Sequence, residues 1–310
     1  MRGSAAVSAT RSDFAQGCVA TIGNFDGVHL GHQALLQRLR AEGVRRHLPT
    51  VVIVFEPHPQ EFFARGGDRP PPARLLRLRE KLERLHAAGV DAVQVLRFNE
   101  TLSRMPAEQF ISVWLEQRLK VRHLVIGDDF RFGYQRRGDF ALLQAASGFS
   151  TEASATVLLD AERVSSTAIR QALATEQFDR AARMLGERYV LSGKVAHGDA
   201  RGRLLGFPTA NIRLHRAVLP LSGVYAVQVH GVAERPLPGV ANIGNRPTVG
   251  GKEPRCETHL FDFAGDLYGK RIQVEPLHKL RGEQKFDGLD ALKAQIARDA
   301  EQARAFFAAG

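Results

Sequence analysis

The chain has 310 residues, of which 44% are hydrophobic, and its formal net charge is +10. This length is sufficient for two well-packed domains. The positive charge favours anionic ligands, but acidic residues lie between the basic ones and no long Lys/Arg run occurs, which disfavours a nucleic-acid-binding surface. Cys18 and Cys256 are far apart, which supports neither a disulfide framework nor a zinc site, and we expect both to be buried.

The N-terminal segment lacks the unbroken apolar core of a secretion signal, and no stretch of the sequence approaches the roughly 18 apolar residues of a membrane-spanning helix. We therefore expect a cytoplasmic protein that does not bind a membrane.

Short apolar segments alternate with longer amphipathic ones from residue 18 to about residue 185. The pattern predicts strands at 18–23, 50–56, 92–98, 123–130 and 153–159, and helices at 30–41, 73–89, 106–120 and 139–148. This alternation is typical of a parallel sheet covered by helices on both faces, whose ligands bind beyond the carboxyl ends of the strands. We predict an α/β domain at 18–185, preceded by an extension at 1–17.

The pattern changes near residue 186 to short segments separated by Gly, Pro and Asn. These segments are 188–197, 207–214, 223–230, 238–245, 256–263 and 270–280. Their spacing predicts a small antiparallel barrel or sandwich in a second domain at 186–310. A final amphipathic stretch, 287–307, places Leu289, Leu292, Ile296 and Ala300 near helical spacing, and we expect this helix to pack on the barrel.

The segment 23–36, "GNFDGVHLGHQALL", follows the first predicted strand and opens a helix. Backbone N–H groups and the positive end of the helix dipole would face an anion there. His29 and His32, three positions apart, share one face of the helix and could form a cradle for a phosphate chain. One of them could instead cap the helix or pack in the core, and a zinc site would need a third ligand.

A second polar motif, "GFPTANI" at 206–212, offers neutral oxygen ligands from Thr209 and Asn211. Mg²⁺ prefers such ligands, although a strand start with outward-facing polar residues has the same pattern. The preceding segment 193–206 is rich in glycine and basic residues, which suits a mobile flap over ATP phosphates. The sequence has no GxxxxGK[ST] motif, so ATP use of the P-loop type is excluded.

The motif "GxFDGxHxGH" resembles that of the nucleotidyltransferase superfamily, in which the HxGH histidines hold the phosphates of ATP. "FEPHP", "GDDFRFG" and "SSTAIR" follow in order, and together these motifs resemble the adenylyltransferase half of the bacterial bifunctional riboflavin kinase/FAD synthetase family. "GKVAHGDARGRLLGFPTANI", "GVANIGNRPTVGG" and "ETHLFDFAGDLYGKRI" resemble its riboflavin kinase domain. The resemblance covers about residues 18–305. It implies a Rossmann-like nucleotidyltransferase domain followed by a six-stranded antiparallel β-barrel with a terminal helix.

The resemblance implies two ATP-dependent reactions, phosphorylation of riboflavin to FMN and adenylylation of FMN to FAD with release of pyrophosphate. In the second, the attacking phosphate is already anionic, so positioning and charge neutralisation are sufficient, and His29, His32 and Arg170 are expected to supply them. Phosphorylation of an alcohol requires a general base. Glu257 matches the family's catalytic glutamate, and its alternative is an outward-facing strand carboxylate.

The resemblance also implies the residues that contact each ligand. ATP is expected to contact Gly23, Asn24, Phe25, Asp26, Gly27, His29, His32, Ser165, Ser166, Thr167, Arg170, Gly193, Lys194, Gly198, Gly206 and Thr209. The flavin is expected to contact His58, Asp129, Asn211, Arg281 and Glu283, and Mg²⁺ to bind Thr209 and Asn211. The expected partners are riboflavin, FMN, FAD and ATP, with a monomeric or weakly self-associating chain.

Two alternatives stay open from the residues. One is a nucleotidyltransferase whose barrel only senses flavin. The presence of Thr209, Asn211 and Glu257 disfavours this alternative. The other is a basic nucleic-acid-binding protein, which the lack of a recognisable binding motif disfavours.

Overall fold

The computed structural model describes residues 14–65, 70–197, 206–248 and 251–309. Contacts divide the chain into two compact units, residues 1–72 with 76–166, and residues 73–75 with 167–310. The domain boundary predicted near residue 186 stays a prediction. Among the described residues, we find no helix with the length and apolar content that crossing a membrane requires.

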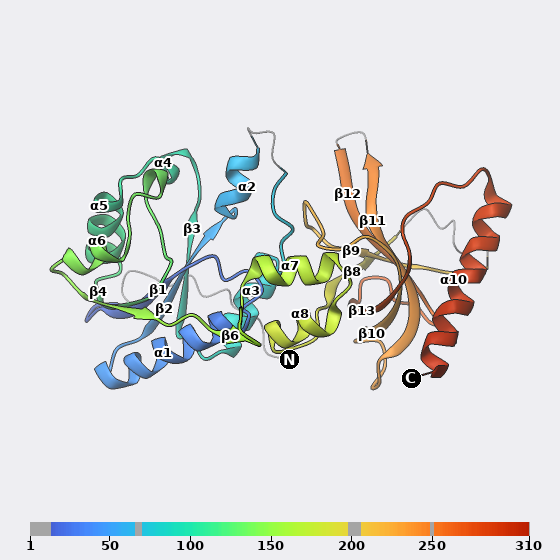
Figure 1. The fold of residues 1–310 in the computed structure, drawn as a ribbon, viewed down its shortest axis with the longest axis horizontal. Coiled ribbons are helices and arrows are strands. Elements are labelled where there is room, and N and C mark those ends of the chain that lie inside the picture. The colour runs from blue at the N-terminus through green and yellow to red at the C-terminus, as the bar shows by residue number, and fades with distance from the viewer. Residues whose placement is uncertain (1–13, 66–69, 198–205, 249–250, 310) are drawn as a thin grey trace. The chain divides into compact units, whose positions relative to one another are not determined.

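The first unit is built on a five-stranded parallel sheet with the strand order β3-β2-β1-β4-β5 (Figure 1). Its strands are β1 (Cys18–Ile22), β2 (Thr50–Glu56), β3 (Ala92–Arg97), β4 (Val121–Gly127) and β5 (Ser150–Ser154). The predicted parallel sheet is therefore confirmed, with β1 at its centre.

Alternate residues of β1 join two different hydrophobic cores. Cys18, Ala20 and Ile22 pack in one core cluster, whereas Val19 packs in the other. Because side chains of a strand alternate between the faces of a sheet, both faces are covered by apolar side chains. Cys18 is buried, as is Cys256 in the second unit, which confirms that expectation.

The helices of the first unit lie between the strands in sequence, as predicted. They are α1 (Leu30–Arg46), α2 (Pro59–Ala64), α3 (Leu78–Ala87), α4 (Glu100–Ser103), α5 (Ala107–Phe110), the π-helix η1 (Ile111–Arg118), the 3₁₀ turn η2 (Tyr134–Arg136) and α6 (Phe140–Ala145). The helix predicted at 73–89 begins only at Leu78. Glu80 caps this start, because its carboxylate accepts a hydrogen bond from the backbone N–H of Arg77 at 2.8 Å, a group that has no partner inside the helix.

The single strand predicted at 153–159 is wrong. β5 ends at Ser154, and residues 158–163 form a separate hairpin of β6 (Leu158–Leu159) and β7 (Glu162–Arg163). The register explains the difference, because β5 pairs with β4 from Ser150 to Ser154 and the apolar residues that follow lie beyond the sheet. Leu158 is accordingly 60% exposed.

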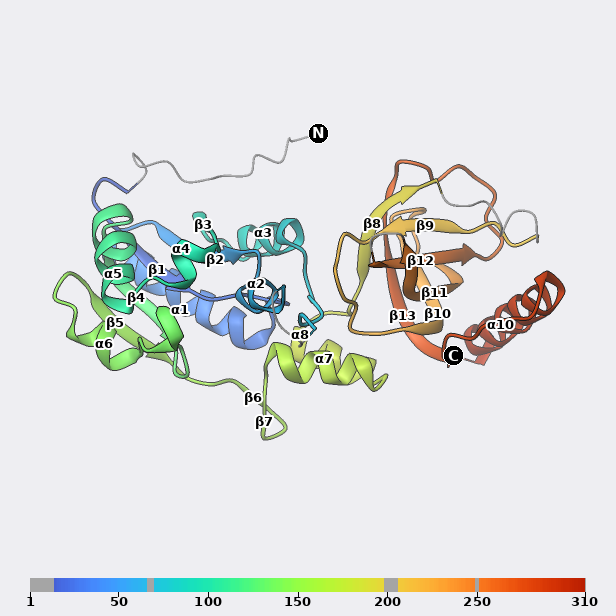
Figure 2. The same ribbon diagram turned by 90° about the horizontal axis from the view of Figure 1, so that it is seen from above.

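The second unit contains a closed barrel in which every neighbouring pair of strands is antiparallel, in the order β10-β11-β12-β9-β8-β13 (Figures 1 and 2). The strands are β8 (Leu191–Ala196), β9 (Ala210–Arg213), β10 (Gly223–His230), β11 (Leu237–Thr248), β12 (Gly251–Leu260) and β13 (Arg271–Arg281). The predicted six-stranded barrel is confirmed over the sandwich. The helices α7 (Ser166–Ala174, from Thr167 on) and α8 (Phe178–Leu185) are grouped with it by the division.

The C-terminal helix α10 (Leu289–Ala309) packs on β10, β11 and β13, as predicted (Figure 2). Ala300 and Ala303 are buried in a hydrophobic cluster that they form with barrel residues such as Val224. Leu289, however, is 65% exposed, so the predicted apolar stripe does not include the first residue of the helix. It follows an exposed segment, 282–285, and the half-buried positions begin at Leu292.

Candidate active sites

The loop from β1 to α1 brings the two predicted histidines into direct contact. His29 is the N-cap of α1, and its Nδ1 accepts a hydrogen bond from the backbone N–H of His32 at 3.4 Å. Their rings stack with centroids 3.7 Å apart, and Phe25 packs on the His32 ring at 4.9 Å. The pair therefore lies at the end of α1 where the helix dipole favours negative charge.

Gly31 allows the histidine rings to stack at this distance. A Cβ atom at Gly31 would lie 3.2 Å from the ring of His29 and 3.5 Å from the carbonyl oxygen of Val164. Earlier in the loop, Gly27 has φ +92°, a conformation that side-chain-bearing residues rarely adopt. A side chain would be too close to the His29 ring at Gly31 and would strain the backbone at Gly27, so glycine suits both positions.

His32 is neutral at pH 7 in the free protein. Burial is the main cause that holds its pKa well below the ordinary value, and the neighbouring His29 and Lys81 lower the pKa further. Its Nδ1 atom is buried and has no hydrogen-bond partner among the described residues. The imidazole of His32 is therefore placed to exchange hydrogen bonds with a ligand, and it carries no charge before one binds.

Phe25 and Asp26 of the same loop are buried, whereas Asn24 is exposed. The Oδ1 atom of Asp26 accepts a hydrogen bond from the backbone N–H of Leu76 at 3.1 Å. The Asp26 carboxylate thereby connects the loop to the chain just before α3. Of these three side chains, that of Asn24 is the one open to solvent.

The "SSTAIR" motif is connected to this loop through its second serine. The hydroxyl of Ser166 donates a hydrogen bond to the backbone oxygen of Asp26 at 2.8 Å, within the first unit. Ser165 is half-buried just before α7. Thr167 is exposed and Arg170 half-buried on α7, which is grouped with the second unit.

His58 and Asp129, both expected to contact flavin, follow the carboxyl ends of β2 and β4, the two strands that flank β1. His58 is buried, and its Nδ1 accepts a hydrogen bond from Gln60 N–H at 3.1 Å, which caps α2. Asp129 follows β4 and is exposed, and its Oδ2 lies 2.7 Å from Nη2 of Arg163. Arg163 in the β6–β7 hairpin is a contact that the sequence did not reveal.

An aromatic group at the carboxyl end of β2 and β3 was also missed. The rings of Phe62, Phe63 and Phe98 meet edge to face, with centroids 5.4 to 5.8 Å apart. Phe63 is 59% exposed, which is unusual for a phenylalanine. The adjacent pair in "QEFFA" is the signal that could have indicated this surface.

In the barrel, Glu257 lies between two asparagines on neighbouring strands. It pairs with Asn211 of β9 on one side and with Asn242 of β11 on the other. Directly paired residues share one face of a sheet, and the adjacent Cys256 and Ile212 are buried in the opposite direction. Glu257, Asn211 and Asn242 therefore form a polar row on the outer face of the barrel.

Glu257 is half-buried in this row, with 39% of its side chain exposed. Its Oε1 lies 3.8 Å from Nη1 of Arg255, two residues earlier on the same strand. Thr209 is half-buried and directly precedes β9, two residues before Asn211. The structure thus brings together Glu257 and Asn211, with Thr209 close by in the chain.

The glycines predicted to contact ATP in the barrel have different surroundings. A Cβ atom at Gly193 would clash with the backbone of Arg213, so close packing of β8 on β9 requires glycine there. Lys194 is exposed and pairs with Arg213 across these strands. Gly206 has φ +86°, and Gly198 lies outside the described residues.

Arg281 and Glu283, also expected to contact flavin, lie at the end of β13. The guanidinium of Arg281 binds both carboxylate oxygens of Asp299 on α10, at 2.9 and 2.8 Å. Glu283 is exposed, and its carboxylate occupies the space that a side chain on Gly244 would need. Arg281 therefore helps to hold α10 on the barrel.

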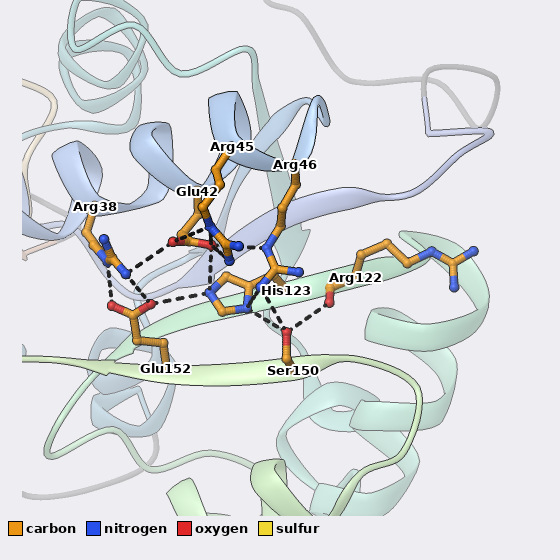
Figure 3. A network of polar contacts seen from close by, with 8 residues as sticks. All are labelled: Arg38, Glu42, Arg45, Arg46, Arg122, His123, Ser150 and Glu152. Carbon is orange, nitrogen blue, oxygen red and sulfur yellow. Dashed lines mark hydrogen bonds and ion pairs between the residues drawn. The ribbon is translucent and has the colours of Figure 1, made fainter.

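In the first unit, a cluster of potential metal ligands lies near the amino end of the parallel sheet, away from the histidine pair. It consists of Glu42, His123 and Glu152 (Figure 3). Nε2 of His123 is 3.7 Å from Glu42 and 3.5 Å from Glu152. Both carboxylates already bind arginines: Glu42 contacts Arg38, Arg45 and Arg46, and Glu152 contacts Arg38. Because the guanidinium groups occupy these oxygens and outnumber the carboxylates, we interpret the cluster as a structural ion-pair network.

This network shifts two pKa values. Hydrogen bonds from Arg45, and then from Arg46, lower the pKa of Glu42 to about 2 against burial, which acts to raise it. Burial and Arg46 lower the pKa of His123. At neutral pH, Glu42 is therefore ionised and His123 neutral.

Comparisons with known proteins cover both units. A family model described as FAD synthetase matches residues 11–168, and one described as riboflavin kinase matches residues 185–307. The bifunctional riboflavin kinase/FMN adenylyltransferase of Escherichia coli (strain K12) is 54% identical over 295 residues, which cover 94% of this chain and 93% of that protein. The protein of the same name from Haemophilus influenzae is 50% identical, with 94% and 95% covered.

One similar solved structure carries a different name. Its title describes a macrolide-efflux protein from Streptococcus pneumoniae, and it matches with a TM-score of 0.76 and 30% identity over 95% of this chain and 96% of that chain. The fold of both units is therefore shared with that structure. The two family models and the curated relatives agree with each other on flavin chemistry.

Proposed function

The chain belongs to the family of bifunctional riboflavin kinase/FMN adenylyltransferases, and we propose that two separate sets of its residues perform the two reactions. The protein phosphorylates riboflavin with ATP to give FMN, and it transfers AMP from ATP to FMN to give FAD and pyrophosphate. We assign the first reaction to the polar row around Glu257 and the second to the loop around His29 and His32. The pairing of Glu257 with Asn211 carries the first assignment.

In the kinase reaction, Glu257 acts as the general base. The nucleophile is the terminal ribityl hydroxyl of riboflavin, which attacks the γ-phosphorus of ATP as its proton passes to the Glu257 carboxylate. The bond from the γ-phosphorus to the bridging oxygen breaks, and ADP leaves. A half-buried carboxylate on a barrel strand suits this role, because the strand holds it in place while solvent and substrate can still reach it. Asn211, the cross-strand partner of Glu257, contacts the flavin or the metal beside this carboxylate.

The donor atoms of the "PTAN" motif fit Mg²⁺. The Thr209 hydroxyl and the Asn211 amide oxygen are neutral oxygen donors, both side chains are half-buried, and the carboxylate of Glu257 lies opposite Asn211. Mg²⁺ commonly binds few protein ligands because water and substrate phosphates complete its shell. When bound, the ion would offset the negative charge of the ATP phosphates. Thr209 and Asn211 would hold it, with Gly193, Lys194, Gly198 and Gly206 near the phosphates.

In adenylyl transfer, the phosphate of FMN attacks the α-phosphorus of ATP and pyrophosphate leaves. The backbone of residues 23–27 and the start of α1 bind the phosphates through N–H groups. The imidazoles of His29 and His32 donate hydrogen bonds to them, and Arg170 adds a positive charge. Hydroxyl and backbone N–H groups at the start of α7, from Ser165, Ser166 and Thr167, also bind the phosphates. The hydrogen bond from Ser166 to the backbone oxygen of Asp26 supports a role beside this loop.

For FMN in the first unit, we propose contacts from His58 and Asp129. The exposed ring of Phe63, with Phe62 and Phe98 behind it, offers an aromatic surface for the isoalloxazine ring. For riboflavin in the barrel, we propose a direct contact from Glu283 and an indirect role for Arg281, whose guanidinium binds Asp299.

We also propose a cytoplasmic location, because both reactions consume ATP. The expectation of a monomer or weak homo-oligomer stays a prediction.

A product assay tests the assignment to separate sites. The pure protein is incubated with ATP and Mg²⁺ and either riboflavin or FMN, and the flavins are separated by chromatography. We expect FMN and FAD from riboflavin, and FAD from supplied FMN. Variants that remove one activity and retain the other support two sites, whereas equal loss of both activities from every single substitution would contradict them.

A further inference from the structure

Helix α3 contains a buried lysine to which the reaction described above gives no role. Lys81 is 2% exposed, and Leu85, one turn later, is fully buried. Residues four apart share a face of a helix, so both side chains point toward the interior of the first unit. Lysine is rarely buried so completely, because an ammonium group loses much hydration energy there.

Three contacts place this face of α3 against the loop that carries the phosphate site. Ahead of the helix, the N–H of Leu76 binds the Asp26 carboxylate. Within the helix, Nη1 of Arg84 donates a hydrogen bond to the backbone oxygen of Gly27 at 3.3 Å. Leu85 packs in the same core cluster as Phe25 and Val28. Lys81 lies between these contact points in the helix, so its side chain is held close to residues 25–28.

Packing connects this face of α3 to one residue of the site, because Leu85 packs in the same cluster as Phe25 and the Phe25 ring lies 4.9 Å from that of His32. The positive charge of Lys81 contributes to the lowering of the pKa of His32, after burial and His29. His32 is consequently neutral in the free protein, and it cannot supply the positive charge that a triphosphate requires before the ligand arrives. A cation beside His32 offsets this lack, because its positive charge acts at the same place without protonation of the imidazole.

We propose that Lys81 is a positioning residue for adenylyl transfer, which supplies a fixed positive charge behind the paired imidazoles of His29 and His32. The inference rests on the proposed phosphate-binding role of these histidines. Lys81 acts beside His32: its charge strengthens the positive potential at the start of α1 and, after burial and His29, it adds to the causes that keep the imidazole neutral until the phosphates bind.

The test compares Lys81→Met, which removes the charge at similar length, with Arg79→Met on the same helix. Arg79 has 60% of its side chain exposed and pairs with Glu83, so it is a matched surface control. FAD formation from supplied FMN is measured as kcat and KM for ATP at about pH 8.5 and about pH 6.0, on either side of the ordinary histidine pKa. Riboflavin phosphorylation by the same samples is measured in parallel.

We expect K81M to lower kcat/KM for ATP at least about tenfold at the higher pH, with R79M unchanged. The defect should shrink at the lower pH, because His32 is easier to protonate without Lys81 and can then restore one positive charge. A lysine with a purely structural role would give the same defect at both pH values. That outcome, or FAD formation within about twofold of the original rate at both pH values, would overturn the inference.

Folding of the first unit is followed through Trp114, the single tryptophan of the chain, which packs against one of its core clusters. If K81M unfolds at a lower temperature than the original protein by this signal, Lys81→Arg is assayed in its place, because it retains the positive charge. A folded K81R with the original pH dependence supports the inference, and a folded K81R with an equal loss at both pH values contradicts it.

His29→Asn is assayed beside these variants to separate the two proposals. Loss of FAD formation in H29N but not in K81M would reject the role of Lys81 alone. Retention in both would reject the phosphate site itself.

Discussion

Asn211 and Glu257 are direct partners across the antiparallel strands β9 and β12. The pairing places a neutral amide and a carboxylate on the same outer face of the barrel, while their neighbours Ile212 and Cys256 fill its interior. Residues 46 positions apart in the sequence thus form one polar site through strand register. The kinase site proposed above depends on this register, because a slip of one residue would turn both side chains into the core.

Replacing Glu257 with Gln should lower FMN formation from riboflavin by about 10²-fold or more, because glutamine cannot accept the hydroxyl proton. Adenylylation of supplied FMN should stay at its original rate, which the chromatographic assay measures in the same sample. Glu234→Gln, in an exposed loop of the same unit, is the control. FMN formation by E257Q at the original rate would show that the carboxylate is a surface group.

Replacing Asn211 with Ala should raise the Mg²⁺ concentration needed for half-maximal FMN formation about tenfold, because one oxygen ligand is lost. The measurement is a titration of kinase activity with Mg²⁺. Asn242→Ala is the matched variant, since Asn242 flanks Glu257 on the other side. If both variants changed the Mg²⁺ requirement equally, proximity to Glu257 rather than metal binding would explain the effect.

Replacing His29 with Asn should lower FAD formation about 10²-fold and leave riboflavin phosphorylation unchanged, because a phosphate-binding imidazole is lost. Asparagine is a favoured N-cap, so α1 retains a capping oxygen, whereas alanine would cost about 1 kcal/mol of stability. His47→Ala, at the C-cap of the same helix, is the control. An unchanged rate of FAD formation in H29N would remove His29 from the site.

The first unit should lose stability as the pH falls. The folded-state pKa values of His32 and His123 lie below the ordinary 6.5, so protonation favours the unfolded chain and stability declines below about pH 6.5. The pKa of Glu42 is about 2 instead of 4.5, so its contribution is present above pH 4.5 and is lost as the pH falls toward 2. Thermal melts followed by Trp114 fluorescence measure both steps.

Glu42→Gln tests the ion-pair network directly. It should lower the free energy of unfolding at pH 7 by about 2 kcal/mol, because three guanidinium groups lose a buried carboxylate, and it should remove the step below pH 4.5. Glu83→Gln, which affects an exposed pair with Arg79, should change stability by less than about 0.5 kcal/mol. Equal effects of the two variants would contradict a structural role for the network.

Alternation of apolar strands with amphipathic helices was sufficient to predict the parallel sheet. The closely spaced segments of the second unit indicated a barrel or a sandwich, and the family resemblance favoured the six-stranded barrel. The pattern failed at residues 153–159, where apolar residues run past the point at which β5 stops pairing with β4. Periodicity reports which residues are apolar, and pairing decides where an edge strand ends.

Contacts between candidate site residues were predictable where a motif is local. His29 and His32 are three positions apart and meet as expected. Asn242, Arg163 and Lys81 were missed because each joins its site through tertiary contacts with a distant segment. The ion pair of Arg281 with Asp299 is a further case, since nothing in the sequence around Arg281 indicates α10 as its partner.

The two sheets differ in whether they have a free edge. Each barrel strand has hydrogen-bonded neighbours on both sides, so the barrel has no outermost strand to which another chain could add. The parallel sheet ends at β3 and β5, and each has a strand neighbour on one side within the described part of the chain. Unwanted association through strand pairing, if heat or acid loosens the protein, should therefore begin at the parallel sheet of the first unit.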